Sequence, residues 1–233
     1  MENTQGQNQF LVPGAILTAG LIIAGAIFYA IGAPPRTQTA SVAGSPESAQ
    51  PRGDLGEAKT EGRPFIGSPT APLTLAYWLD FQCSYCKKFE QETLPLIIQE
   101  YVNSGELKVV FKDLQFLSPL SQAAGIVGKA VWEAAPSQYL DWQIAMFDQQ
   151  GKWQSEQDII ALAGEVGLDA ERISMLLEQN RSRYQAALDA DRAEAGSFGI
   201  TGTPGFLIGG RTISGAQPFA VFSQVIDEVL QQQ

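Results

Sequence analysis

The chain has 233 residues, 45% of them hydrophobic, which is enough apolar material for one or two folded domains. Its formal net charge is -10, with 15 Lys and Arg against 25 Asp and Glu, and no basic cluster offers the phosphate neutralisation that nucleic-acid binding requires. The sequence has no histidine and only two cysteines, which excludes Ser–His and Cys–His catalysis, His-ligated metal sites and a four-cysteine zinc site within the chain.

An almost wholly apolar run covers residues 12–33 and follows a short tail, residues 1–11, that has no Lys or Arg. As a helix this run would reach about 33 Å, which is enough to cross the hydrocarbon core of a membrane. A cleaved signal peptide is the alternative, but it would normally have a basic start and a shorter apolar run. We therefore predict a single, uncleaved transmembrane anchor at residues 12–33.

Residues 34–63 are rich in Pro, Ser, Ala, Gly and Gln and contain few large apolar side chains. A segment of this composition cannot bury enough apolar surface to fold, so we predict a flexible linker. The folded domain is then predicted to span residues 64–233.

Within that domain, the apolar run Leu73–Leu79 has the length and composition of a buried strand and leads directly into residues 80–83. A helix should follow to about Val102, with a kink at Pro95, because proline lacks the amide donor. The remaining predicted elements are a strand at Leu107–Phe111, helices at Ala123–Ala134, Tyr139–Phe147, Asp158–Val166, Ala170–Glu178 and Tyr184–Ala195, strands at Phe206–Ile208 and Arg211–Ile213 joined by a Gly-Gly turn, and a final helix that starts at Pro218.

Cys83 and Cys86 form a Cys-X-X-Cys motif at the start of the first predicted helix. Cys83 would lie among the unsatisfied amide donors at the positive end of the helix, which favour a thiolate, and Cys86 would lie one turn further along. We predict that Cys83 is the exposed nucleophile and Cys86 the shielded resolving thiol of a reversible disulfide. Haem attachment is excluded because Lys87 stands where that motif needs histidine. The alternative is a pair of buried cysteines without chemistry.

The segment DFQCSYCKKFEQETLP, the later segment GITGTPGFLIGG and the helical block between them resemble the DsbA-like branch of the thioredoxin superfamily. The resemblance covers about residues 64–232. It implies a thioredoxin-like α/β fold with a helical subdomain inserted at about residues 118–199. It also implies a cis bond before Pro204, which would face the disulfide, and a Thr203 backbone that binds the substrate strand.

Two positions depart from the pattern of that family. Ser84 follows the first cysteine where proline is frequent, and Tyr77 occupies a position where many relatives carry a glutamate that assists proton transfer. Asp80 is a candidate replacement for this acid, or it is only a capping or solvated residue. Ser84, Tyr85 and Asp80 are therefore candidates for tuning the cysteine pair.

The motif and the resemblance together predict a protein-disulfide oxidoreductase, and we favour a thiol oxidase that acts on exported proteins. The redox-active disulfide would serve without a bound cofactor or metal. The resemblance implies reoxidation by a membrane partner that is DsbB-like or similar to vitamin-K-epoxide reductase (VKOR-like). The alternatives are a reductase or isomerase of the same fold, a membrane-tethered peptide-binding module or chaperone without turnover, and a copper carrier.

Two signals bear on the orientation of the predicted anchor. Arg36, just after the apolar run, favours a cytoplasmic location for the residues that follow it. A dithiol that exchanges with disulfides instead belongs in a compartment where disulfides persist. We give the chemistry more weight and predict a catalytic domain on the extracytoplasmic side, periplasmic or luminal.

Overall fold

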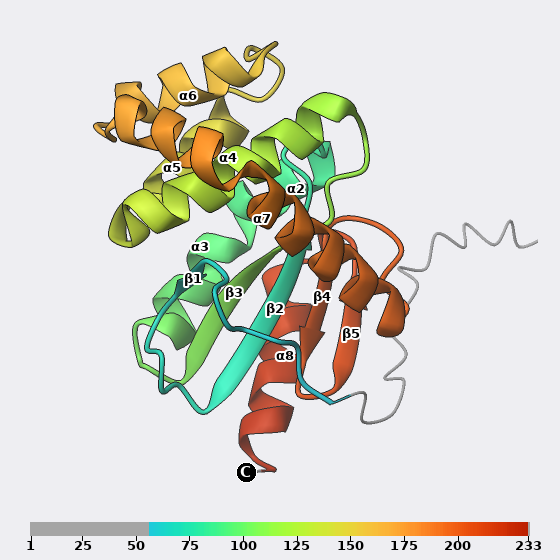
Figure 1. The fold of residues 1–233 in the computed structure, drawn as a ribbon. Coiled ribbons are helices and arrows are strands. Elements are labelled where there is room, and N and C mark those ends of the chain that lie inside the picture. The colour runs from blue at the N-terminus through green and yellow to red at the C-terminus, as the bar shows by residue number, and fades with distance from the viewer. Residues whose placement is uncertain (1–55, 233) are drawn as a thin grey trace, which may run out of the picture. The chain divides into compact units, whose positions relative to one another are not determined.

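The computed structural model describes residues 56–232 and contains a five-stranded mixed sheet (Figure 1). In spatial order the strands are β1 (Phe65–Ile66), β3 (Leu107–Asp113), β2 (Leu73–Leu79), β4 (Gly205–Ile208) and β5 (Arg211–Ser214). The β2–β3 pair is parallel, and the other three pairs are antiparallel. The four predicted strands are confirmed. Strand β1 was missed because two residues are too few to show a pattern.

The predicted tail and anchor, residues 1–11 and 12–33, lie outside the described residues, as does the predicted linker up to residue 55. Between residues 56 and 232, no helix is both long and apolar enough to span a membrane.

Strand β2 is buried on both of its faces, which explains why its sequence is continuously apolar. Leu75, Tyr77 and Leu79 belong to the large core that continues into the helical insertion. Ala76 and Trp78 point the other way, into a smaller cluster. A strand enclosed in this way has little freedom to shift, so the residues that follow it start from a fixed position.

One face of the sheet is covered by the helices that follow β2 and β5. These are α2 (Ser84–Glu92), α3 (Leu94–Ile97), a π-helical turn η1 (Ile98–Val102) and α8 (Phe219–Leu230). The predicted interruption near Pro95 is confirmed, because α2 ends at Glu92 and Pro95 lies in the first turn of α3. Pro218 is the N-cap of α8, which is the predicted start of that helix.

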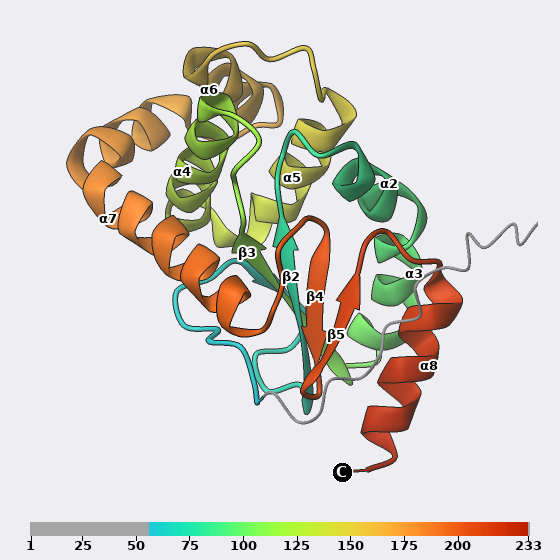
Figure 2. The ribbon, with the colours of Figure 1, turned by 90° about the vertical axis from the view of Figure 1, so that its right-hand side faces the viewer.

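The inserted subdomain follows β3 and is entirely helical. It contains α4 (Pro119–Ala134), a short 3-10 helix η2 (Pro136–Gln138), α5 (Tyr139–Asp148), α6 (Glu156–Glu165) and α7 (Ala170–Ser197). Figure 2 shows α3 and α8 on one side of the sheet and α7 on the other. The thioredoxin-like α/β fold with a helical insertion is therefore confirmed.

The prediction of two separate helices between residues 170 and 195 was wrong, because α7 is continuous. The polar stretch 179–183 misled the prediction, although it contains neither glycine nor proline. Arg181 pairs with Glu156 at 2.6 Å and Arg183 pairs with Glu133 at 2.5 Å, so these polar residues hold α7 against α6 and α4.

A cluster of buried charges joins α7 to the sheet and to α4. Lys112 of β3 and Lys129 of α4 approach Asp191 of α7 with nitrogen–oxygen distances of 3.0 and 3.4 Å. Lys129 also lies 2.5 Å from Asp113, and Arg63 lies 2.6 Å from Asp191. Burial alone would raise the pKa of Asp191, but the three cations hold this pKa below its ordinary value.

Residues 58–63, which the composition assigns to the linker, contact the domain near this cluster. Ala58 is buried, the Lys59 amide donates to Glu194 at 2.7 Å, and the Lys112 ammonium donates to the Lys59 carbonyl at 2.9 Å. The ordered domain therefore begins before residue 64.

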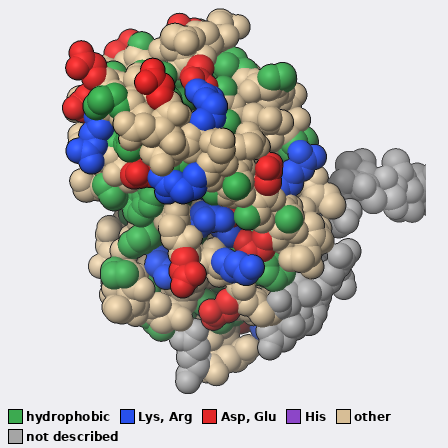
Figure 3. Space-filling view, viewed as in Figure 1, with side chains coloured by type: hydrophobic (Ala, Val, Ile, Leu, Met, Phe, Trp, Pro, Cys, Tyr) green, Lys and Arg blue, Asp and Glu red, His purple; other side chains and the backbone are tan. Residues whose placement is uncertain are grey.

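On the face shown in Figure 3, Lys and Arg side chains are interleaved with Asp and Glu side chains.

Replacing Asp191 with asparagine should destabilise the protein by about 3–5 kcal/mol, because it would leave buried cations without their shared counter-charge. Denaturant unfolding of the full-length protein measures this loss. Asp189→Asn, at an exposed position on the same helix, is the matched control and should change stability by less than about 0.5 kcal/mol. Equal effects of the two variants would contradict a stabilising role for the buried cluster.

Candidate active site

The loop after β2 places Cys83 at the N-cap of α2. The Cys83 amide donates to the Asp80 carbonyl at 3.0 Å, which closes a tight turn between strand and helix. The Cys83 sulfur accepts a hydrogen bond from the Cys86 amide at 3.4 Å. The sulfur therefore occupies the place of a capping oxygen, at the positive end of the helix, as the spacing of the motif predicts.

The two cysteines are free thiols in this structure, and their environments differ. The Cys86 thiol lowers the pKa of Cys83 to about 6 against the opposing effect of burial, and the Thr203 side chain and two helix amides add to this lowering. Burial raises the pKa of Cys86 well above its ordinary value. Cys83 was predicted to be exposed, but both cysteines are buried: Cys83 is 8% exposed and Cys86 0%, so Cys83 is only the more accessible of the two.

Thr203 and Pro204 approach the cysteines from the loop before β4. The Thr203–Pro204 peptide bond is cis, in agreement with the prediction. The Cys83 thiol donates to the Thr203 main-chain carbonyl at 3.3 Å, although 120 residues separate the two in the sequence. Pairing of β4 with β2 brings these segments together.

The carboxylate of Asp80 is occupied by main-chain donors. One oxygen accepts from the Gln82 amide at 2.8 Å, and the other accepts from the amides of Phe116 and Leu117 at 2.9 and 3.1 Å. It is the Asp80 backbone, not its carboxylate, that donates toward the Cys86 sulfur. The structure therefore favours a structural role for Asp80, in which it ties the active-site loop to the loop that follows β3.

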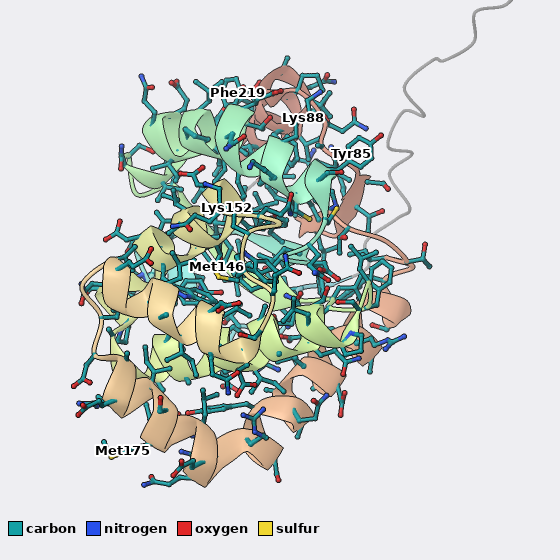
Figure 4. The ribbon with its side chains drawn as sticks, turned by 90° about the horizontal axis from the view of Figure 1, so that it is seen from above. Tyr85, Lys88, Met146, Lys152, Met175 and Phe219 are labelled. Carbon is teal, nitrogen blue, oxygen red and sulfur yellow. The ribbon has the colours of Figure 1, made fainter. Side chains whose placement is uncertain are left out.

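The residues between the cysteines face solvent. Ser84 is exposed, and Tyr85 is 65% exposed, at the surface end of α2 (Figure 4). The Tyr85 amide is one of the donors that lower the pKa of Cys83. Lys87 donates to the Asp148 carbonyl at 3.3 Å, and Lys88 pairs loosely with Glu92, so both lysines have partners away from the sulfurs.

Two further residues at the site were missed from the sequence. The Gln150 side chain donates to the carbonyls of Phe81 and Cys83 at 2.9 and 3.1 Å, so the helical insertion is hydrogen-bonded to the loop that carries Cys83. A glutamine in a loop gives no sequence signal for such a contact. Glu90 is buried on α2, and its spacing of four residues after Cys86 would have placed it on the same helical face.

In the residues that the structure describes, no group of three or more Cys, Asp or Glu side chains is arranged to hold a metal ion. The site brings together one thiol that favours its anion, one thiol that retains its proton, and the main-chain carbonyl of Thr203 beside Pro204.

A short alkylation pulse on the reduced full-length protein should label Cys83 and spare Cys86. The rate of labelling should rise through about pH 6, where Cys83 titrates, because only the thiolate reacts. Mass mapping after the pulse measures both sites, and the denatured protein, in which both should react, is the control. Preferential labelling of Cys86 in the folded protein would reverse the assigned roles.

Comparison with known proteins agrees with this geometry. Residues 59–228 match the family model Thioredoxin_4, described as thioredoxin. Disulfide bond formation protein D of Bacillus subtilis (strain 168) is 22% identical over 178 residues, which cover 75% of this chain and 80% of that protein. The crystal structure of oxidised BdbD from Bacillus subtilis has a TM-score of 0.68 and 21% identity, with 76% of this chain and 97% of that chain covered.

A second solved structure, alpha-DsbA1 from Wolbachia pipientis, has a TM-score of 0.65 and 18% identity, with 75% and 94% of the two chains covered. At these identities, the solved structures establish the fold, and the family model covers most of the chain. The chain belongs to the thioredoxin family.

Proposed function

We propose that this protein is a thiol–disulfide oxidoreductase that works as an oxidase, transferring its Cys83–Cys86 disulfide to pairs of thiols in other proteins. The observation that carries the proposal is the contrast between the two thiols. The pKa of Cys83 is lowered to about 6, whereas the pKa of Cys86 is raised by burial. A cysteine that is stable as a thiolate is a good leaving group, so a disulfide that contains it is readily donated.

The reaction uses two successive exchanges. A substrate thiolate attacks the Cys83 sulfur, forms a mixed disulfide and expels Cys86, which takes up a proton. The second substrate thiolate then attacks the substrate sulfur of that mixed disulfide and expels Cys83 as a thiolate. The substrate loses two electrons and gains a disulfide, and the enzyme is left as the dithiol form that the structure describes.

The loop beside Cys83 provides a surface for the substrate main chain. The Thr203 carbonyl already accepts a hydrogen bond from the Cys83 thiol, so a polypeptide bound along Thr203 would bring its own cysteine to the same sulfur. Tyr85 on α2 and Phe116 and Leu117, whose amides donate to Asp80 in the loop before Cys83, have exposed side chains that would offer apolar contacts without demanding a particular sequence. These features fit unfolded, thiol-containing proteins as substrates.

Turnover requires an oxidant that converts the dithiol of the enzyme back to its disulfide. A membrane protein of the DsbB-like or VKOR-like kind would fill this role, and an anchor at residues 12–33 would keep the domain near it. An oxidising compartment outside the cytoplasm is where donated disulfides persist. The name of the Bacillus subtilis relative, disulfide bond formation protein D, supports transfer in the direction from thiols to disulfide.

The oxidised full-length protein, mixed with a reduced peptide that contains two cysteines, should convert the peptide to its disulfide in one turnover. Mass spectrometry after acid quenching follows both partners. Cys83→Ser should abolish the reaction, because it removes the attacked sulfur. Cys86→Ser should trap a mixed disulfide of Cys83 only when the peptide is supplied as an activated disulfide.

The direction of transfer is tested with the same peptide in its disulfide form. The dithiol enzyme is mixed with the peptide disulfide, and the extent of reduction is compared with the extent to which the disulfide enzyme oxidises the reduced peptide. If reduction is the greater, the protein is a reductase. If Cys83→Ser still binds the peptide and the unaltered protein shows no exchange with it, the protein is a peptide-binding module.

A further inference from the structure

Gln82, the residue directly before Cys83, is held in place by hydrogen bonds at both its main chain and its side chain. Its side-chain carbonyl oxygen accepts from two hydroxyls at the start of α4, those of Ser118 and Ser121, the second at 2.9 Å. Its main-chain amide donates to the Asp80 carboxylate at 2.8 Å. The side chain of Gln82 is therefore fixed beside the nucleophile, and the exchange reaction described above does not use it.

The hydrogen bonds of Ser118 determine which end of the Gln82 amide faces α4. As the N-cap of α4, the Ser118 oxygen accepts from the amides of Leu120 and Ser121, both at 3.1 Å. Since its lone pairs are used in this way, the Ser118 hydroxyl can approach Gln82 only as a donor, and only the carbonyl oxygen of Gln82 can accept. The NH2 group of Gln82 therefore points away from these hydroxyls.

The NH2 group of Gln82 has two N–H donors that the fold leaves unused. Neither has a hydrogen-bond partner among residues 56–232. The nitrogen is not one of the buried polar atoms, and Gln82 as a residue is half-buried, so the two donors are open to solvent. A donor that the fold already orients can bind a ligand at a lower cost in side-chain ordering than a free surface glutamine.

A polypeptide that brings a cysteine to Cys83 also brings main-chain carbonyls. Consecutive Cα atoms are about 3.8 Å apart, so the carbonyls that flank the reacting cysteine of a substrate come within reach of the residue next to Cys83. A carbonyl that leaves water without finding a donor is costly to bury. The NH2 group of Gln82 can supply that donor.

The loop before β4 offers the substrate a group of the opposite kind. The Thr203 carbonyl is an acceptor beside the Cys83 sulfur. Pro204 has no amide hydrogen, and its carbonyl already accepts from the Gly215 amide at 2.9 Å. Because a substrate main chain carries both N–H and C=O groups, the acceptor at Thr203 and the donor at Gln82 complement each other.

We propose that Gln82 is a substrate-binding residue, whose NH2 group donates a hydrogen bond to a main-chain carbonyl of the polypeptide beside its reacting cysteine. The inference rests on the exchange activity proposed above and names the part of the substrate that is recognised. Because every residue of a polypeptide has this carbonyl, the contact favours polypeptide thiols over small thiols and selects no sequence. No covalent bond changes at Gln82, which affects only how the polypeptide is bound and oriented.

Gln82→Glu tests the donor separately from the role of Gln82 in holding the loop. A carboxylate keeps an acceptor for Ser118 and Ser121 but replaces the NH2 group with an oxygen, and near the surface it is ionised at about pH 7. If Gln82 only held the loop, its carbonyl oxygen would suffice and this variant would react normally with a polypeptide.

The oxidised full-length protein is reacted at about pH 7 with a reduced peptide that contains two cysteines and no charged side chains, and separately with dithiothreitol, which has no carbonyl. Acid quenching and mass spectrometry give the two second-order rate constants. The rate constant for the peptide is divided by that for dithiothreitol, which removes the effect of the added charge on the sulfurs. In Gln82→Glu this ratio should fall about ten-fold, because a donor is lost and an oxygen faces the substrate carbonyl.

Gln122→Glu is the matched control, because it makes the same change at an exposed position of α4. It should leave the ratio unchanged. A ratio that is unchanged in Gln82→Glu, or that falls equally in both variants, would overturn the inference and leave the proposed function standing. If the unaltered oxidised protein reacts with neither the peptide nor dithiothreitol, the proposed function is refuted, and the inference with it.

NMR of a variant that retains Gln82 keeps the inference testable if Gln82→Glu does not fold. Cys86→Ser is loaded on Cys83 with the same peptide as a mixed disulfide, or with cysteamine for comparison, so that the site is fully occupied. Proton–nitrogen NMR then compares the side-chain amides of the two forms. An amide hydrogen of Gln82 should shift downfield in the peptide form, with those of Gln122 unmoved. Identical Gln82 signals in the two forms would overturn the inference.

Discussion

The hydrogen bond from the Cys86 amide to the Cys83 sulfur joins the chemistry of this protein to its fold, because it forms only when Cys83 is the N-cap of α2. Strand β2, enclosed on both faces, fixes that starting point. Asp80 and Gln150 then hold the intervening loop from two sides, one through the segment after β3 and the other from the helical insertion. The helical insertion therefore helps to position Cys83. The buried ion pairs of Asp191 attach the insertion to the sheet.

The second constraint is burial, which acts in opposite ways on two thiols one helical turn apart. Cys83 has donors at the helix end that outweigh burial, whereas Cys86 is enclosed by the core and keeps its proton. The difference gives the disulfide a good leaving group at Cys83, the more accessible of its two sulfurs. It also means that Cys86 must gain a proton each time the disulfide opens.

Local patterns in the sequence predicted four of the five strands, the helix after Cys83 and the break near Pro95, since each depends on neighbouring residues. The contact between Cys83 and Thr203 spans 120 residues and was predicted only through the family resemblance. Asp80 was a candidate acid because it is near the motif in sequence, whereas its carboxylate faces amides of a distant loop. The continuity of α7 depends on ion pairs with other helices, and Gln150 acts through a loop, so neither leaves a local signal.

In the proposed oxidase, folding favours the Cys83 thiolate and thereby makes the disulfide oxidising. The most direct test compares the free energy of unfolding of the reduced and oxidised protein at about pH 7 and pH 5. Because the pKa of Cys83 is depressed by folding to about 6, the gain in the reduced form is complete above the unfolded thiol pKa and disappears as pH falls through 6. The disulfide closes a very short loop, so its own effect on the unfolded chain is small. We expect the reduced form to be more stable than the oxidised form by roughly 1 kcal/mol at pH 7, with little difference at pH 5. An oxidised form that is clearly the more stable at pH 7 would contradict it.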